Sequence, residues 1–163
     1  MNRAMQSADV FRSLVEYDRA LWGRTWESIL RLTEEQFIQD LPYSHGSIRN
    51  QMVHVASTVR RWLGGLKGAR EARSSRPDPA DYRTREEAGA LWEEAAQDLN
   101  SYLSSLTEED LGRIPNGMRG PVWQVLAHLV NHGTDHRAQV LRALHDFGAP
   151  TFDQDLVLHL WRR

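Results

Sequence analysis

Apolar residues recur at intervals of three and four along four long stretches of the chain, with polar residues between them. This spacing places apolar side chains on one face of an α-helix. The stretches cover residues 8–32, 47–65, 88–106 and 121–148. No stretch alternates apolar and polar residues as a half-buried strand does. The pattern therefore predicts an all-α fold in which four amphipathic helices pack as a four-helix bundle.

Helix-start signals and breaks separate these stretches. Thr33, Thr84 and Thr107 each begin the capping-box pattern, in which an acidic or amide residue follows three positions later. Residues 67–83 are rich in charge, Ser and Pro, which predicts a long crossover connection across the end of the bundle; a lid is the alternative. Residues 153–163 are predicted to form a short C-terminal helical tail.

Length and composition narrow the class of protein. The 163 residues suit a single domain spanning 1–163 with a substantial core. The 20 basic and 22 acidic side chains nearly balance, which argues against nucleic acid or an anionic membrane as the main partner. The chain has no cysteine, which excludes disulfides, cysteine-based zinc sites and a catalytic thiol of its own. Neither a signal peptide nor a run of ~20 apolar residues is present, so we expect a soluble cytoplasmic protein.

Three histidines, His128, His132 and His136, follow one another at a spacing of four in the fourth predicted helix. Because a helix turns 100° and rises 1.5 Å per residue, the first and last differ by about 80° and ~12 Å and cannot share one ion. On the helical wheel His136 points toward the apolar face, His132 lies at its edge and His128 faces outward. His132 and His136 have the spacing by which a helix offers two nitrogens to one metal, without the glutamate of the HExxH motif.

A catalytic metal site needs about three protein ligands, so a third donor must come from another helix. His54 is the candidate, because it lies in a polar row beside the apolar face of the second predicted helix. That row comprises Ser47, Gln51, His54 and Thr58. Paired Glu-x-x-His motifs are absent, which disfavours a di-iron carboxylate site. Histidines that only pack or face solvent remain the alternative, and His45 and the basic residues of 60–76 are interpreted as surface groups.

The second and fourth predicted helices resemble the DinB family of DinB/YfiT-like metalloenzymes. The resemblance is carried by Gly46-Ser-Ile-Arg, His54 and Trp62 on the second helix and by His132-Gly-Thr-Asp-His136-Arg-Ala-Gln139 on the fourth. These parts stand in the order that the family has, and the similarity runs over nearly the whole chain. Asp135 and Ala138 depart from the usual pattern and leave the histidines untouched.

The resemblance implies a three-histidine site for a divalent metal, namely zinc, nickel or iron. By position, His54, His132 and His136 would be the ligands. Gln139 lies on the same side of the helical wheel and is a candidate to hold a ligand or a metal-bound water in place. Arg137 points about 100° away from His136 and is assigned to contacts between helices or subunits.

The same resemblance implies an activity, because characterised relatives in the superfamily include thiol-dependent transferases. The expected reaction transfers a low-molecular-weight thiol to a small electrophilic substrate, with catalytic residues other than the metal ligands unassigned. A metal-dependent hydrolase of small molecules and a non-catalytic, stress-associated interaction bundle are the alternatives. Members of the family often pair, so a homodimer is also expected.

Overall fold

The computed structural model describes residues 7–69, 74 and 76–161. Within these ranges all regular structure is helical, which confirms the predicted all-α fold. The long helices are α1 (Ser7–Ile29), α3 (Ile48–Lys67), α5 (Arg85–Ser104) and α7 (Val122–Asp146); the short ones are α2 (Glu34–Ile38), the 3-10 helix η1 (Pro79–Asp81), α6 (Glu108–Gly112) and α8 (Leu156–Trp161). None of the described helices is both long and apolar enough to cross a membrane.

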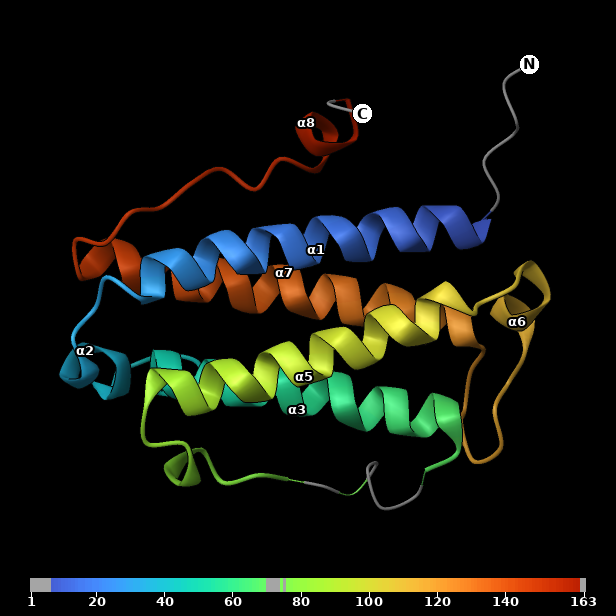
Figure 1. Ribbon diagram of the computed structural model, residues 1–163, viewed down its shortest axis with the longest axis horizontal. Helices are drawn as coiled ribbons and strands as arrows, with labels where there is room; N and C mark the ends of the chain where they lie inside the picture. Colours follow the sequence, from blue (N-terminus) through green and yellow to red (C-terminus); the bar gives the residue numbers. More distant parts are fainter. Residues whose placement is uncertain (1–6, 70–73, 75, 162–163) are drawn as a thin grey trace.

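The four long helices lie side by side (Figure 1). Contacts link α1 to α7, α7 to α3, α3 to α5 and α5 back to α1, and the buried apolar residues between these helices form two clusters. Helices α3 and α5 run in one direction, and α1 and α7 run in the opposite direction. This arrangement places α3 and α7, the two helices that carry the predicted histidines, next to each other and antiparallel.

The connection between α3 and α5 has to return along the length of the molecule, because these two helices run in the same direction (Figure 1). Residues 70–73 and 75 of this connection lie outside the described residues. Its longest described part, 76–84, contains η1, which packs against α3. A long crossover is therefore present, but its described part follows the flank of α3 instead of crossing an end of the bundle.

The helix ends follow the signals in the sequence. Helices α2, α5 and α6 begin at the capping boxes of Thr33, Thr84 and Thr107. The side chain of Ser47 caps the start of α3, where it accepts a hydrogen bond from a backbone N–H of the first turn. Gly68 ends the same helix with φ at 75°, a left-handed conformation that favours glycine.

One charged side chain is fully buried between the long helices. Arg137 on α7 has no exposed surface, and its guanidinium donates hydrogen bonds to the carboxylate of Asp18 on α1 and to the side-chain oxygen of Gln154. The hydroxyl of Tyr17 donates to the backbone carbonyl of Gln154. The segment before α8 is thus fastened to α1 and α7, and Arg137 serves contacts between helices, as its direction on the wheel indicated.

Candidate metal centre

The three histidines that the sequence singled out lie together in the structure. His54 on α3 faces His132 and His136 on α7, and the Nε2 atoms of His54 and His132 are 3.1 Å apart. The ring centroid of His136 is 4.7 Å from that of His54 and 4.3 Å from that of His132. His136 is buried, and the other two are half-buried. The antiparallel contact of α3 with α7 therefore brings the three imidazoles to one place.

A fourth imidazole joins them from the loop before α3. The ring of His45 stacks on that of His54 with centroids 3.8 Å apart, although His45 itself is exposed. One ligand nitrogen from each of His45, His54 and His136 falls within 4.8 Å of the others. The sequence interpretation of His45 as a surface group was therefore incomplete, because it missed this contact with the cluster.

The position of His45 depends on an unusual turn. Ser44 and Gly46 both have positive φ, at 56° and 89°, and the backbone N–H of Gly46 donates to the carbonyl of Tyr43. The side-chain amide of Asn50 donates to the carbonyl of His45 at 2.8 Å, which ties the turn to the first turn of α3. A left-handed conformation at a serine is uncommon, and no helical periodicity reports where such a loop directs its side chains.

Gln51 determines which nitrogen of His136 faces the cluster. Its side-chain oxygen lies 2.7 Å from His136 Nδ1, and its amide group donates to Gln139 Oε1 at 3.0 Å and to the hydroxyl of Ser44. Because an amide oxygen can only accept, Nδ1 of His136 carries the proton and Nε2 keeps its lone pair. The sequence suggested that Gln139 holds a metal ligand directly. In the structure Gln139 instead bonds to Gln51, which in turn bonds to His136.

The surroundings favour the neutral form of the histidines. Burial, reinforced by repulsion from neighbouring imidazoles and Arg61, lowers the pKa of His54 to about 4. Burial, reinforced by the other imidazoles, lowers the pKa of His132 to about 3 and lowers that of His136 as well. At neutral pH these rings therefore present uncharged nitrogens, which is the form that coordinates metals.

The geometry also fits one ion between two of the rings. Two imidazole nitrogens bound to a tetrahedral zinc ion at 2.0–2.1 Å lie roughly 3.3 Å apart. The observed separation of 3.1 Å between His54 Nε2 and His132 Nε2 is close to that value. The donor set is therefore suited to a borderline divalent cation such as zinc, nickel or iron(II).

His128, the remaining histidine of the three spaced by four residues, lies at the edge of the cluster. His128 is exposed, with its ring against Trp62 at a centroid distance of 5.1 Å and against His132 at 5.5 Å. This agrees with its outward direction on the helical wheel.

Two pockets reach the histidine cluster. An inner pocket of about 110 Å³ lies between all four long helices, with His132 in its wall among mostly apolar side chains such as Trp22, Trp92 and Leu129. An outer pocket of about 320 Å³ is lined by His45 and His54 together with residues of α3 and of the connection. We name these the inner pocket and the outer pocket. The cluster therefore borders one pocket inside the bundle and another on its outer side.

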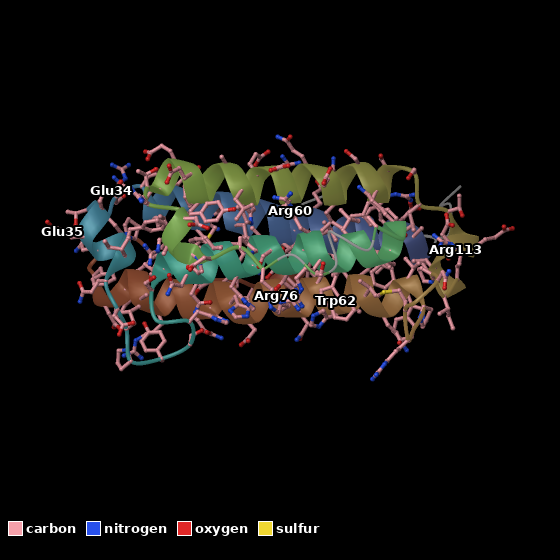
Figure 2. The ribbon with its side chains drawn as sticks, turned by 90° about the horizontal axis from the view of Figure 1, so that it is seen from below. Glu34, Glu35, Arg60, Trp62, Arg76 and Arg113 are labelled. Carbon is pink, nitrogen blue, oxygen red and sulfur yellow. The ribbon has the colours of Figure 1, made fainter. Side chains whose placement is uncertain are left out.

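The outer pocket contains basic residues that the sequence interpretation left on a solvated face. Arg61 on α3 and Arg76 on the connection both line it. Figure 2 shows Arg76 beside the middle of α3 and α7, while Arg60 lies on the flank of α3 toward α5. Arg61 is half-buried, unlike the exposed Arg60. The described end of the connection thus covers part of the pocket at the cluster.

Comparison with known proteins agrees with this arrangement. The model of a family described as the DinB family matches residues 1–162. A solved structure of a DinB-like protein from Bacillus cereus ATCC 10987 superimposes with a TM-score of 0.67 and 19% identity, over 88% of this chain and 94% of that one. No curated protein gives a significant match.

Proposed function

Because the chain belongs to the DinB family, we propose that it is a divalent-metal-dependent enzyme whose ion is held by His54, His132 and His136. The observation that carries the proposal is the convergence of these neutral imidazoles from two antiparallel helices beside two pockets. A cluster packed without a pocket would favour a structural metal or an interaction protein. Pockets on both sides of the cluster support an enzyme instead.

The bound ion would supply a Lewis acid that keeps its full positive charge among neutral ligands and lowers the pKa of an incoming thiol or water. The chain prepares for this by holding the ligand imidazoles neutral. Gln51 keeps His136 in the tautomer with a free Nε2, and burial keeps His54 and His132 neutral. Zinc, nickel and iron are the candidate metals.

We propose that the reaction transfers a low-molecular-weight thiol to a small electrophile. The chain has no cysteine, so a sulfur nucleophile must come from outside. The exposed His45 imidazole in the wall of the outer pocket is placed to accept the proton that such a thiol loses when its sulfur bonds to the electrophile, and to return that proton to the adduct or to the departing group. The inner pocket, which is mostly apolar although Glu16, Asp18 and Arg19 also line it, suits the carbon skeleton of the second substrate.

The family resemblance also leads us to propose a cytoplasmic homodimer. Exposed apolar side chains provide surface for pairing, with Trp161 at 76% exposure and Trp123 at 44%. Sedimentation that shows only monomer over a wide concentration range would exclude the dimer.

Elemental analysis of untagged protein, purified without chelator, tests the site. We expect near-stoichiometric metal in the wild type and its loss in His54→Ala, His132→Ala and His136→Ala. His45→Ala should retain the metal but lose activity, because His45 is assigned to proton transfer. His145→Ala is the matched control, since His145 is an exposed residue near the end of α7.

The other outcomes of the metal measurement are equally informative. Loss of metal in His45→Ala with retention in His132→Ala would replace the proposed ligand set by His45, His54 and His136. A wild type without metal even after reconstitution would reject the metalloenzyme and leave an interaction protein. With metal established, hydrolysis of an ester or amide panel in the absence of thiol would replace thiol transfer by hydrolysis.

A further inference from the structure

The outer pocket gathers positive charge beside the histidine cluster. Its described lining contains the guanidinium groups of Arg61 and Arg76, the polar side chains of Asn50 and Ser57, and no aspartate or glutamate. A concave surface whose lining carries one sign of charge concentrates ligands of the opposite charge. The composition of the lining therefore favours an anionic ligand.

Arg61 does not behave as an ordinary surface arginine. Its Nε is buried and has no hydrogen-bond partner among the described residues. Burial lowers its pKa, and the nearby charge of Arg76 lowers it further, so the two guanidinium groups are close enough to repel each other. A buried charged donor without an acceptor is costly, and its natural complement is an anion.

The preceding residue provides an internal comparison. Arg60 is exposed on the other flank of α3, and its guanidinium lies 3.6 Å from the carboxylate of Glu94 on α5. One helical position therefore separates a paired, solvated arginine from a half-buried arginine that faces a pocket.

We propose that the outer pocket binds an oxyanion group of a small molecule through Arg61 and Arg76, and thereby directs the rest of that molecule toward His54. Guanidinium groups bind carboxylates and phosphates through paired N–H donors, so the ligand class is a carboxylate or phosphate. The pocket volume of about 320 Å³ exceeds the space that a bare anion fills, which leaves room for a carbon skeleton. His54 lies in the same wall, so the anion would lie beside the histidine cluster.

This inference rests on the proposed function, because it states that one substrate of the proposed reaction is anionic. The binding step itself needs no metal. It can therefore be tested on metal-free protein, where the loss of activity does not obscure the result.

The test is calorimetric titration of the full chain, after chelation of metal, with succinate, with inorganic phosphate and with the neutral analogue succinamide. We expect at least one of the two anions to bind saturably, with its affinity reduced at least tenfold by Arg61→Gln and by Arg76→Gln. Arg60→Gln is the matched control and should bind as the wild type does. Succinamide should not bind. Addition of 0.5 M sodium chloride should lower the affinity for the anion. Comparison of the affinities for succinate and phosphate identifies which oxyanion the pocket prefers.

Thermal unfolding of the same variants separates binding from folding. Because the buried Nε of Arg61 lacks a partner, Arg61→Gln should leave the melting temperature unchanged or raise it, and the bound anion should raise that of the wild type. Absence of saturable binding by both anions, or equal losses in Arg60→Gln and Arg61→Gln, would overturn the proposal.

The two hypotheses fail in different ways. Anion binding that disappears in Arg61→Gln while no metal binds supports the pocket and rejects the metalloenzyme. Metal-dependent thiol transfer whose KM is the same in Arg61→Gln and in the wild type rejects the pocket and leaves the enzyme. An increase of at least tenfold in KM with little change in kcat would support both.

Discussion

Gln51 is the residue whose replacement best tests how the cluster is oriented. It is almost fully buried, with 4% exposure, and its side-chain oxygen accepts a hydrogen bond from the Nδ1–H of His136. We expect Gln51→Leu to lower metal affinity by about 10- to 100-fold, because it frees the ring to rotate and to change tautomer. Gln51→Glu keeps the acceptor and should retain most of the affinity. Competition with a chromogenic zinc chelator measures both, and a Leu variant that binds as tightly as wild type would contradict the role of Gln51.

At this scale the sequence predicted the residues that helices orient. His54, His132 and His136 could be placed because a helical wheel gives their directions, and the family resemblance joined the two helices. His45 could not be placed in the same way, because its direction depends on a left-handed Ser44. Arg61 was assigned to a solvated face, since only the tertiary structure shows that the connection packs over it.

Close approach of α1 to α7 depends on a glycine. A Cβ at Gly133 would lie 2.6 Å from Asp18 Oδ1, and that carboxylate is held by the fully buried Arg137. Replacement of a helix-interior glycine by alanine normally stabilises a protein by about 1 kcal/mol. At Gly133 the ion pair has to shift, so we expect Gly133→Ala to destabilise the protein by about 2 kcal/mol.

Gly23 on α1 provides the matched control, because a Cβ there would meet no atom within 4 Å. Gly23→Ala should therefore show the ordinary stabilisation of roughly 0.5–1 kcal/mol. Urea unfolding of the two variants measures both effects. Equal shifts of the two midpoints in the same direction would show that Gly133 is not needed for this helix contact.

Features of the helices could be predicted where they depend on neighbouring residues in the sequence, and not where they depend on what packs against them. The capping boxes at Thr33, Thr84 and Thr107 lie within the sequence, so the starts of α2, α5 and α6 were predictable. The parallel course of α3 and α5 was not, because the length of residues 67–83 permits a short or a long path. In the sequence Gly133 is only a weak helix former, and its role requires knowledge of what packs against it.

At the scale of the whole molecule, a cluster of polar histidines lies inside an apolar bundle. Burial of charged imidazoles would be costly, and the cluster avoids this cost because its histidines are neutral. The inner pocket and the outer pocket meet this cluster from two sides, one mostly apolar and one basic. The same neutrality makes the metal-free fold sensitive to acid.

The lowered histidine pKa values predict how the stability of metal-free protein depends on pH. An unfolded histidine binds its proton near pH 6.5, whereas His54 and His132 in the folded protein do so only near pH 4 and pH 3. Between these values the unfolded chain binds more protons, so the free energy of unfolding is highest above pH 6.5 and falls as pH decreases toward 4. Asp18 acts in the opposite sense, because burial raises its pKa to about 6 and the folded state takes up its proton first.

The two contributions can be separated with the double variant His54→Asn, His132→Asn. Urea unfolding at pH 7, 6, 5 and 4 with chelator present should show a steeper loss of stability in the wild type than in the variant. The variant keeps His136, whose lowered pKa acts in the same sense, and Asp18, which opposes it, so its curve should be flatter than that of the wild type. Parallel curves would mean that the two imidazoles have the same pKa in the folded and the unfolded protein, and a cluster kept neutral by burial would then have to be abandoned.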